Sequence, residues 1–349
     1  IKVLNSFLLF FVLFVVLRLC SYVDNKKTSL PSYFICDNLI LCKDVLSLSN
    51  TSVYRGYAIL IIMLCHIAGC WNFVGFTPFG GIGVAMFLFL SGYGLNESWK
   101  KNGLKSFWKK KVLRVIFPYV LFRMIWLMID GSILDGSAYF SIVNCSHSSF
   151  WYIDYLVRCY IAFYISNKLL NGKYKLLLLL LFAIYSFSCL SSLCAEQAFS
   201  FLVGVIVSER KRVIDCVPFR KVCFYNSFLL LLGIGCLALK QLSFMRDLSN
   251  THWFLLCELG IKLPLGISFM TLLYLMRNMV NSQVIVMFGT ISLELYLIHI
   301  WLVKYIVKDS VFQGLALIIV SALLAYSFNK MCNYCTNLLV ADKRNDNAN

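Results

Sequence analysis

The sequence predicts an all-α membrane protein: a polytopic bundle of about ten transmembrane helices plus an extra N-terminal span. Three observations predict this class. The chain has 349 residues, of which 60% are hydrophobic and 14% charged, and its mean hydropathy is +0.78. Apolar runs recur at close to twenty residues, the length of helix that crosses ~30 Å of hydrocarbon. Basic residues gather at the ends of these runs, as in the cytoplasmic loops of membrane proteins.

The net charge of +16 does not indicate a nucleic-acid-binding protein. The basic residues border apolar runs, which follows the positive-inside pattern and suits an anionic leaflet surface. We therefore expect a lipid bilayer, and no nucleic acid, as a partner. The predicted location is the inner (plasma) membrane, which the chain crosses several times.

The N-terminal region, 1–50, is expected to contain the extra span at 3–22 and a cytoplasmic connector. Arg18 and the absence of a small-residue cleavage site argue against a signal peptide. Within the connector, 34–48 is partly apolar and could lie on the membrane surface or pack on the bundle as a loop. The membrane domain follows at 51–340, and 341–349 is a polar tail.

Ten spans are expected in the membrane domain, and strongly basic connections alternate between them. The connection at 100–111 carries six lysines, and those at 168–175 and 210–221 are also basic. This asymmetry places these loops and the C-terminus in the cytoplasm and the N-terminus outside. The expected spans are 55–73, 81–98, 112–130, 150–167, 175–193, 197–209, 222–240, 253–276, 284–303 and 311–338.

Few charges fall inside these spans. Asp154 and Arg158 are four residues apart, as are Glu258 and Lys262, so each pair shares one helix face and is expected to form a structural ion pair. The chain has 15 cysteines, mostly within apolar runs, where free Cys acts as a small hydrophobe. The one CxxC, at 332–335, lacks a second pair or nearby histidines. We expect no bound metal or cofactor.

The stretch RGYAILIIMLCHIAGC begins at Arg55 and places His66 eleven residues later. Eleven helical steps return to within ~20° of the same face and rise ~16 Å. If Arg55 lies at one interface, His66 lies near mid-depth, directly above it. An ionisable residue at that depth is a functional-site hypothesis by default, although a lone histidine between helices is often only a structural hydrogen-bond partner.

Three further motifs follow in order: GGIGVAMFLFLSGYGL, a lysine cluster leading to Arg114, Pro118 and Tyr119, and GTISLELYLIH, which ends at His299. Together with Arg-x10-His, they resemble the acyltransferase 3 family of integral membrane O-acyltransferases, of the polysaccharide O-acetyltransferase type. The resemblance extends over most of the chain. It implies a bundle of ten spans and transfer of an acyl group, most simply acetyl, from acyl-CoA to a carbohydrate or glycolipid acceptor.

The resemblance and the residue chemistry together predict a catalytic role for His66. A histidine can take the proton of an acceptor hydroxyl as a general base, or carry the acyl group as a nucleophile, and the sequence leaves both open. Donor binding is predicted for three cations, because guanidinium and ammonium groups bind phosphate: Arg55, Lys111 and Arg114.

Some of these predictions have simpler alternatives. Arg55 and the lysines could serve simply to anchor the ends of their spans. Lys111 stands where the family commonly has arginine, so it lacks the fork geometry of a guanidinium. Pro118 is expected to kink its helix and leave the Arg114 carbonyl unpaired.

Four residues are predicted to line or support the cavity, although helix packing, interfacial anchoring or structural hydrogen bonds could also explain them. On the late motif helix, Ser292, Tyr296 and His299 share one face, whereas Glu294 points elsewhere. The four supporting residues are Ser91, Trp151, Tyr296 and His299.

The sequence thus predicts a membrane acyltransferase that uses cytoplasmic acetyl-CoA and acts on a cell-envelope or surface carbohydrate. The alternative is a multispan transporter or flippase of an envelope precursor, without acyl-transfer chemistry. A polysaccharide polymerase would be expected to have a large outer loop with paired acids or arginines, and the outer loops here are short.

Overall fold

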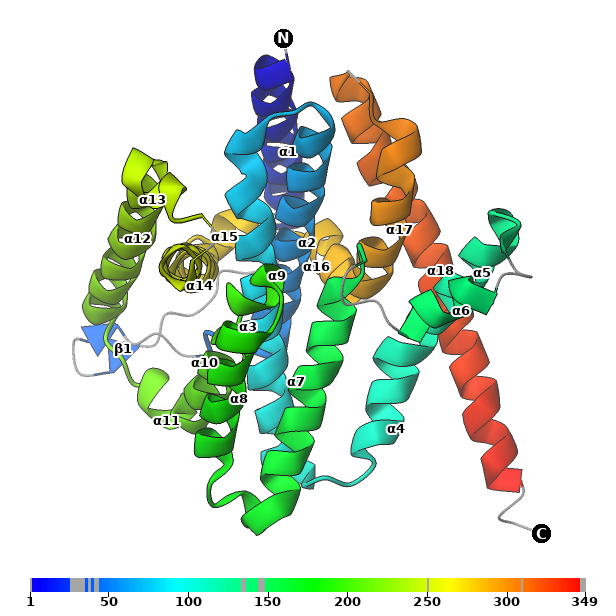
Figure 1. Cartoon of the computed structure of the whole chain (residues 1–349). Helices are drawn as coiled ribbons and strands as arrows, with labels where there is room; N and C mark the ends of the chain where they lie inside the picture. The colour runs from blue at the N-terminus through cyan, green and yellow to red at the C-terminus, as the bar shows by residue number, and fades with distance from the viewer. Residues whose placement is uncertain are drawn as a thin grey trace.

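The computed structural model confirms an all-α helix bundle, accompanied by one short antiparallel hairpin (Figure 1). The structure describes residues 2–25, 35–36, 39–40, 44–132, 136–143, 148–249, 251–308 and 310–345. Residues 34, 37–38 and 41–43 of the predicted surface segment at 34–48, and residues 346–349 of the polar tail, lie outside these ranges.

The helices of ten or more residues are α1 (Lys2–Asn25), α2 (Leu48–Cys70), α3 (Thr77–Asn102), α5 (Phe117–Ile129), α7 (Trp151–Lys168), α8 (Lys175–Cys189), α10 (Ser200–Glu209), α12 (Phe219–Gln241), α14 (His252–Leu275), α17 (Ser292–Ile306) and α18 (Val311–Asn345). The shorter ones are α4 (Phe107–Lys111), α6 (Gly136–Val143), α9 (Ser192–Ala195), α11 (Lys211–Ile214), α13 (Ser243–Asp247), α15 (Arg277–Val280) and α16 (Gln283–Thr290). A π-helical turn, Val112–Ile116, joins α4 to α5, 3₁₀ turns occupy Val74–Phe76 and Leu169–Gly172, and strands β1 (Ile35–Cys36) and β2 (Leu39–Ile40) pair with each other.

Every predicted span is mainly helical in the structure, but not every helix has the length and composition of a membrane span. In the described part of the chain eight helices do, and the bent pair α16–α17 could form a ninth span. The other two predicted spans are not among these helices, since α7 includes the charged residues Asp154, Arg158 and Lys168, and α8 has only 15 residues. The chain is therefore a multi-pass membrane protein with fewer standard spans than the eleven expected.

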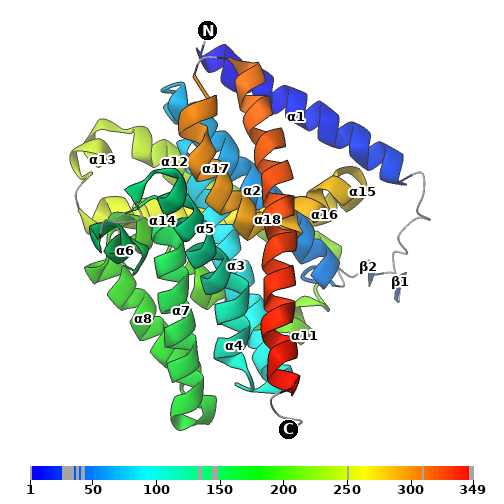
Figure 2. The same ribbon diagram turned by 90° about the vertical axis from the view of Figure 1, so that its right-hand side faces the viewer.

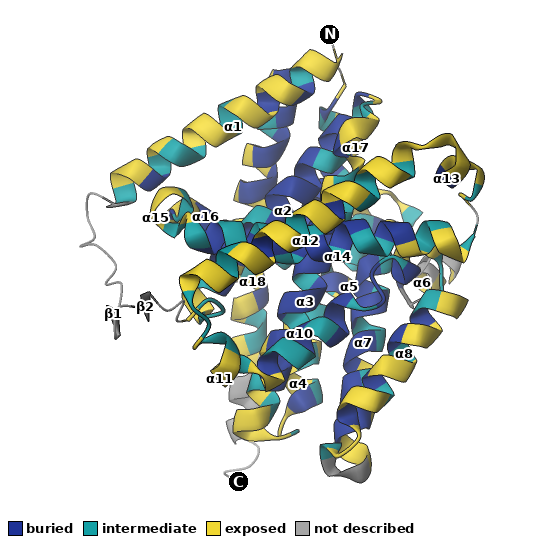
Figure 3. Cartoon of the chain, turned by 90° about the vertical axis from the view of Figure 1, so that its left-hand side faces the viewer, coloured by how far each residue is buried: buried dark blue, intermediate teal, exposed yellow. Residues whose placement is uncertain are grey.

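The core of the bundle is built on α2, which packs against α3, α16 and α17. Ala58, Ile59, Met63 and Ile67 of this helix are fully buried. Figure 3 shows α2 and α3 largely buried, whereas α1, α8 and α12 present exposed faces. Those outer faces carry large apolar side chains such as Leu231 of α12, which is 70% exposed, as expected of surfaces that contact lipid.

The two chain ends lie at opposite ends of the bundle (Figure 2). Helix α1 is formed as predicted and slants along the outside, in contact with α15, α16 and α18. It is fixed to α15 and to the first residue of α16 by two hydrogen bonds: Arg18 donates to the Met279 carbonyl at 3.2 Å, and Asp24 accepts from the Gln283 amide at 2.8 Å. The N-terminal helix is thus an integral part of the bundle.

Helix α14 lies across the other helices: it is seen end-on in Figure 1 and lengthwise in Figure 3. Its predicted ion pair is present, with Lys262 Nζ 3.0 Å from Glu258 Oε2. The pair is extended by Glu196, which contacts Lys262, and by Lys240, which contacts Glu258. Buried charges are tolerated inside a membrane domain when they are paired in this way.

The second predicted pair is also present on α7, where Arg158 Nε lies 2.8 Å from Asp154 Oδ2. The arginine side chain is 42% exposed, so this pair lies at the edge of the bundle. Its geometry agrees with the structural role expected from the sequence.

Close backbone contact joins α2 to α16 at two glycines. A methyl group at Gly56 would overlap the carbonyl oxygen of Ile285, and one at Gly289 would overlap that of Ser52. Small residues allow helices in membranes to approach this closely. The contact fixes the position of Arg55, which neighbours Gly56.

Replacing Gly56 with alanine should destabilise the protein by about 1–3 kcal/mol, because the added methyl forces α2 and α16 apart. Thermal unfolding in detergent measures this change. The control is Gly69→Ala on the same helix, where a methyl group meets nothing within 4 Å. Equal stabilities for the two variants would contradict the packing argument.

Candidate functional site

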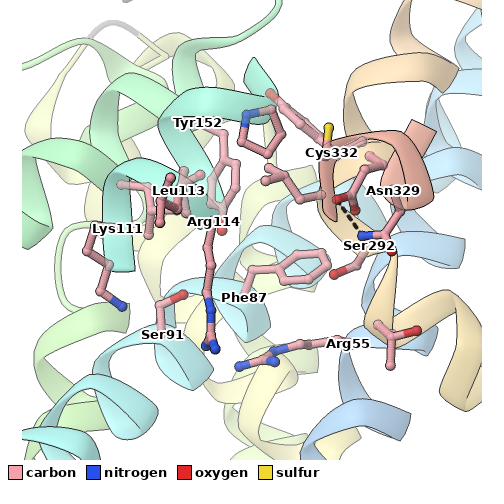
Figure 4. Close-up of a pocket in the computed structure, with 18 of the residues that line it drawn as sticks. Arg55, Phe87, Ser91, Lys111, Leu113, Arg114, Tyr152, Ser292, Asn329 and Cys332 are labelled. Atoms are coloured by element: carbon pink, nitrogen blue, oxygen red, sulfur yellow. Dashed lines mark hydrogen bonds between the residues drawn. The ribbon is translucent and has the colours of Figure 1, made fainter. Parts of the chain in front are cut away.

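A cavity of about 760 Å³ lies in the bundle, bounded by α2, α3, the α4–α5 segment, α7, the α16–α17 bend and α18 (Figure 4). Its walls combine apolar, cationic, hydroxyl and amide side chains. The lining residues are Arg55, Ile62, Val84, Phe87, Ser91, Lys111, Leu113, Arg114, Val115, Pro118, Tyr152, Leu156, Tyr160, Gly289, Thr290, Ser292, Leu293, Glu294, Tyr296, Asn329, Cys332, Asn333, Thr336 and Asn337.

The three predicted donor-binding cations all line this cavity. Figure 4 shows the guanidinium groups of Arg55 and Arg114 facing one another, with the Lys111 ammonium beyond Ser91. In the described part of the chain no carboxylate lies within 4 Å of any of the three. Lys111 Nζ instead lies 4.7 Å from the centroid of the Tyr160 ring, a cation–π arrangement. Converging cations without acidic partners form a site suited to an anion.

Arg114 is presented to the cavity by the π-helical turn Val112–Ile116. In this turn the Phe117 amide donates to the Val112 carbonyl, five residues earlier. The wider turn leads directly into α5, near whose start Pro118 lies, so the helical run continues past this proline. Single π turns in α-helices occur often at functional sites.

A second, amide-rich wall faces the cavity from α17 and α18. Asn329 Nδ2 donates to Glu294 Oε1 at 2.8 Å, and Asn333 Nδ2 donates to Asn329 Oδ1 at 2.9 Å. Glu294 is only 5% exposed. The prediction that Glu294 points away from the site is therefore wrong: the chain bends by 81° between α16 and α17, and the cavity borders more than one face of the first turn of α17.

The predicted catalytic histidine pairs with the predicted supporting one. His66 Nδ1 on α2 lies 2.9 Å from His299 Nε2 on α17, and the two rings are nearly parallel, with centroids 5.1 Å apart. The side chain of His299 is fully buried, and its Nδ1 lies 2.7 Å from the Leu295 carbonyl oxygen. His66 is half-buried.

The histidine pair lies next to the cavity rather than in its wall. Ile62 lines the cavity and precedes His66 by four residues, which places the two ~6 Å apart along the helix. On the other helix, Tyr296 lines the cavity and its ring centroid lies 6.1 Å from that of His299. The Tyr296 hydroxyl donates to the Ser149 carbonyl at 2.9 Å, so α17 is held to the segment before α7.

The remaining predicted positions divide between the cavity and its surroundings. Ser91 lines the cavity, whereas Trp151 is half-buried and its ring packs edge-on against Tyr152, which does line it. Tyr160 and the asparagines of α18 were not identified from the sequence. The asparagines had a recognisable signal, since Asn329, Asn333 and Asn337 recur every four residues on a helix that begins as an apolar span.

Metal-ligating groups do not gather in the described part of the chain, where no cluster of three or more His, Cys, Asp or Glu side chains could hold an ion. Cys332 lines the cavity as a free thiol. The chemistry available at this site is that of two histidines, three cations, one carboxylate and several hydroxyl and amide groups.

Comparison with curated proteins and with solved structures gave no significant match. A family model described as an acyltransferase domain matches residues 52–329. This range contains the histidine pair, the three cations and the bend at α16–α17. The match extends over most of the chain and includes all four motifs, so the protein belongs to the acyltransferase 3 family of membrane acyltransferases.

Proposed function

We propose that this protein transfers an acetyl group from cytoplasmic acetyl-CoA to a hydroxyl of a cell-envelope or surface carbohydrate. One observation carries the proposal. Arg55, Lys111 and Arg114 converge, with no described carboxylate within 4 Å of any of them, in a cavity that reaches to within one helical turn of His66. Such a site would bind the phosphates of CoA at the cations and place a base, His66, near the thioester at the other end of the donor.

The dimensions of the donor support this arrangement. Between its phosphate oxygen and its sulfur, the pantetheine arm has about as many chain bonds as four amino-acid residues, and so extends ~14 Å. Arg55 and His66 are eleven residues apart on α2, a rise of ~16 Å. Phosphates bound at the cations would therefore leave the thioester near the histidine pair, with the amide-rich wall available to the uncharged part of the donor.

The proposed orientation follows from the basic connections. The α3–α4 connection, α11 and the C-terminus lie toward the same end of the bundle in Figures 1 and 2. We assign this end to the cytoplasm of a plasma-membrane protein, because Lys and Arg accumulate in cytoplasmic loops. The carbohydrate acceptor would then approach His66 from the opposite side, and this part of the proposal rests on the family resemblance.

Removing a phosphate-binding group should weaken donor binding. Arg114→Gln is expected to raise the Kd for acetyl-CoA about 10- to 100-fold, because a hydrogen bond to a charged group contributes ~1.5–3 kcal/mol. Titration calorimetry in nanodiscs measures this without an acceptor. The matched control is Lys101→Gln, an exposed position in the same basic segment, which should leave the Kd unchanged.

The donor itself provides a further control for this variant. S-Acetylpantetheine lacks the phosphates, so it should bind the parent protein and Arg114→Gln equally weakly. A comparable loss of affinity for both donors would show that Arg114 acts through the fold rather than through phosphate.

Replacing His66 with alanine should abolish transfer and leave donor binding intact. O-Acetyl esters on the surface glycan of a host that carries the variant, detected by NMR, are expected to disappear, while the Kd for acetyl-CoA changes less than about twofold. Esters at the parent level would remove the catalytic role of His66. Movement of an envelope precursor across liposomes without acyl transfer would instead support the transporter alternative.

Ile62 lines the cavity one helical turn from His66, so a larger residue there should obstruct the thioester. Ile62→Trp is expected to lower the transfer rate by at least tenfold, with phosphate binding retained, whereas Ile62→Leu conserves the volume and should be tolerated. Transfer rates and acetyl-CoA affinities measured on both variants test this. Full activity of the tryptophan variant would place the path of the acyl group elsewhere.

A further inference from the structure

The hydrogen bonds of the two histidines determine which nitrogen of each ring holds a proton. At the buried end of this chain of hydrogen bonds, the Leu295 carbonyl oxygen can only accept, and His299 Nδ1 lies 2.7 Å from it. His299 Nδ1 must therefore be the protonated nitrogen of that ring.

A neutral imidazole has one N–H and one lone pair. With the proton on Nδ1, His299 Nε2 is an acceptor. His66 Nδ1, at 2.9 Å from it, must then be the donor. This leaves a lone pair on His66 Nε2, which no described residue engages by a hydrogen bond. The half-buried position of His66 leaves its ring accessible.

The other proton arrangements are costly. Reversing the direction would place the His299 Nδ1 lone pair against the lone pairs of the Leu295 oxygen at 2.7 Å, which is repulsive. Protonating His299 on both nitrogens would place a charge on a side chain that is fully buried and has no carboxylate within 4 Å among the described residues. Burial of an unpaired charge is strongly unfavourable.

We propose that His299 is a positioning residue that holds His66 in the Nδ1–H tautomer, so that His66 Nε2 is the nitrogen that acts on the acceptor. This inference rests on the proposed acyl transfer. It gives His299 the part that the aspartate has in a Ser-His-Asp triad, where the third residue sets the tautomer and orientation of the base.

The reaction then balances as follows. The acceptor oxygen forms a bond to the thioester carbonyl carbon while its proton passes to His66 Nε2. The carbon–sulfur bond breaks, and the departing sulfur takes the proton from Nε2. The products are an O-acyl ester and the CoA thiol, and His66 returns to its starting tautomer. If the acyl group passes through histidine instead, the same Nε2 lone pair is the nucleophile.

The tautomer can be read directly in the parent protein. With ¹⁵N-labelled histidine, of which the chain has four, His66 should show a protonated Nδ1 and an unprotonated Nε2. The His66→Ala spectrum assigns the signals. A proton on His66 Nε2 in the parent protein would overturn the inference, and this measurement requires neither an acceptor nor a folded His299 variant.

Kinetics test the functional consequence. His299→Leu removes the acceptor and should lower kcat for acetyl transfer to the host's surface polysaccharide, measured as CoA thiol released, by about 10²–10⁴-fold. The KM for acetyl-CoA should change less than about twofold. His299→Gln offers an amide oxygen to the His66 Nδ1–H and should recover at least tenfold of the loss. The control is His252→Leu, an exposed histidine at the start of α14, which should retain the parent kcat.

The outcomes separate this inference from the proposed function. Loss of transfer in His66→Ala with parent kcat in His299→Leu would overturn only the role of His299. Parent transfer in His66→Ala would overturn the proposed function itself. A fall in kcat for His299→Leu that His299→Gln does not relieve would mean that position 299 fills space rather than accepting a hydrogen bond.

Discussion

The mutual repulsion of three cations is the constraint on which this structure depends. Arg55, on α2, and Lys111 and Arg114, on the α4–α5 segment, line one cavity. Charges of the same sign repel more strongly inside a bundle than in water, because the surroundings screen them less. Acidic partners relieve this elsewhere in the molecule, as in the Glu196–Lys262–Glu258 network. Among the described residues no acidic side chain lies within 4 Å of these three cations, which leaves an anionic ligand as the natural source of compensation.

Close helix packing holds these cations in place against that repulsion. Gly56 and Gly289 bring the backbones of α2 and α16 into contact, immediately beside Arg55. The chain then bends by 81° into α17, which places the Glu294 side chain against α18 and carries Tyr296 and His299 toward α2. A single tight crossing thus positions both Arg55 and the histidine pair, and it requires the glycine with which the GTISLELYLIH motif begins.

Much of the fold could be predicted because hydrophobicity and charge act locally along the chain. The run of apolar segments and the placement of Arg55 and His66 on one face of α2 needed only helical periodicity. The pairing of His66 with His299 could not be predicted, since His299 is 233 residues away and nothing in the spacing specifies which helices meet. Glu294 was misplaced because one helix face was assumed to border the cavity, whereas Ser292, Leu293 and Glu294 all line it. Trp151 was predicted to line or support the cavity, and it packs against Tyr152, which lines it; an aromatic pair at a helix start does not indicate which ring faces inward.

The pairing of two histidines, rather than a histidine and a carboxylate, suits a reaction inside a membrane domain. In the mechanism we propose, a neutral His299 would orient His66 without adding a fixed charge to the bundle, whose interior tolerates unpaired charge poorly. During the proposed transfer, positive charge would develop on His66 as a proton reaches Nε2, while negative charge would develop on the thioester oxygen. These charges arise together and close to each other, so each stabilises the other and the net charge of the site stays constant. A carboxylate at position 299 would bind the imidazolium more tightly, but it would place a fixed negative charge in the bundle when His66 is neutral.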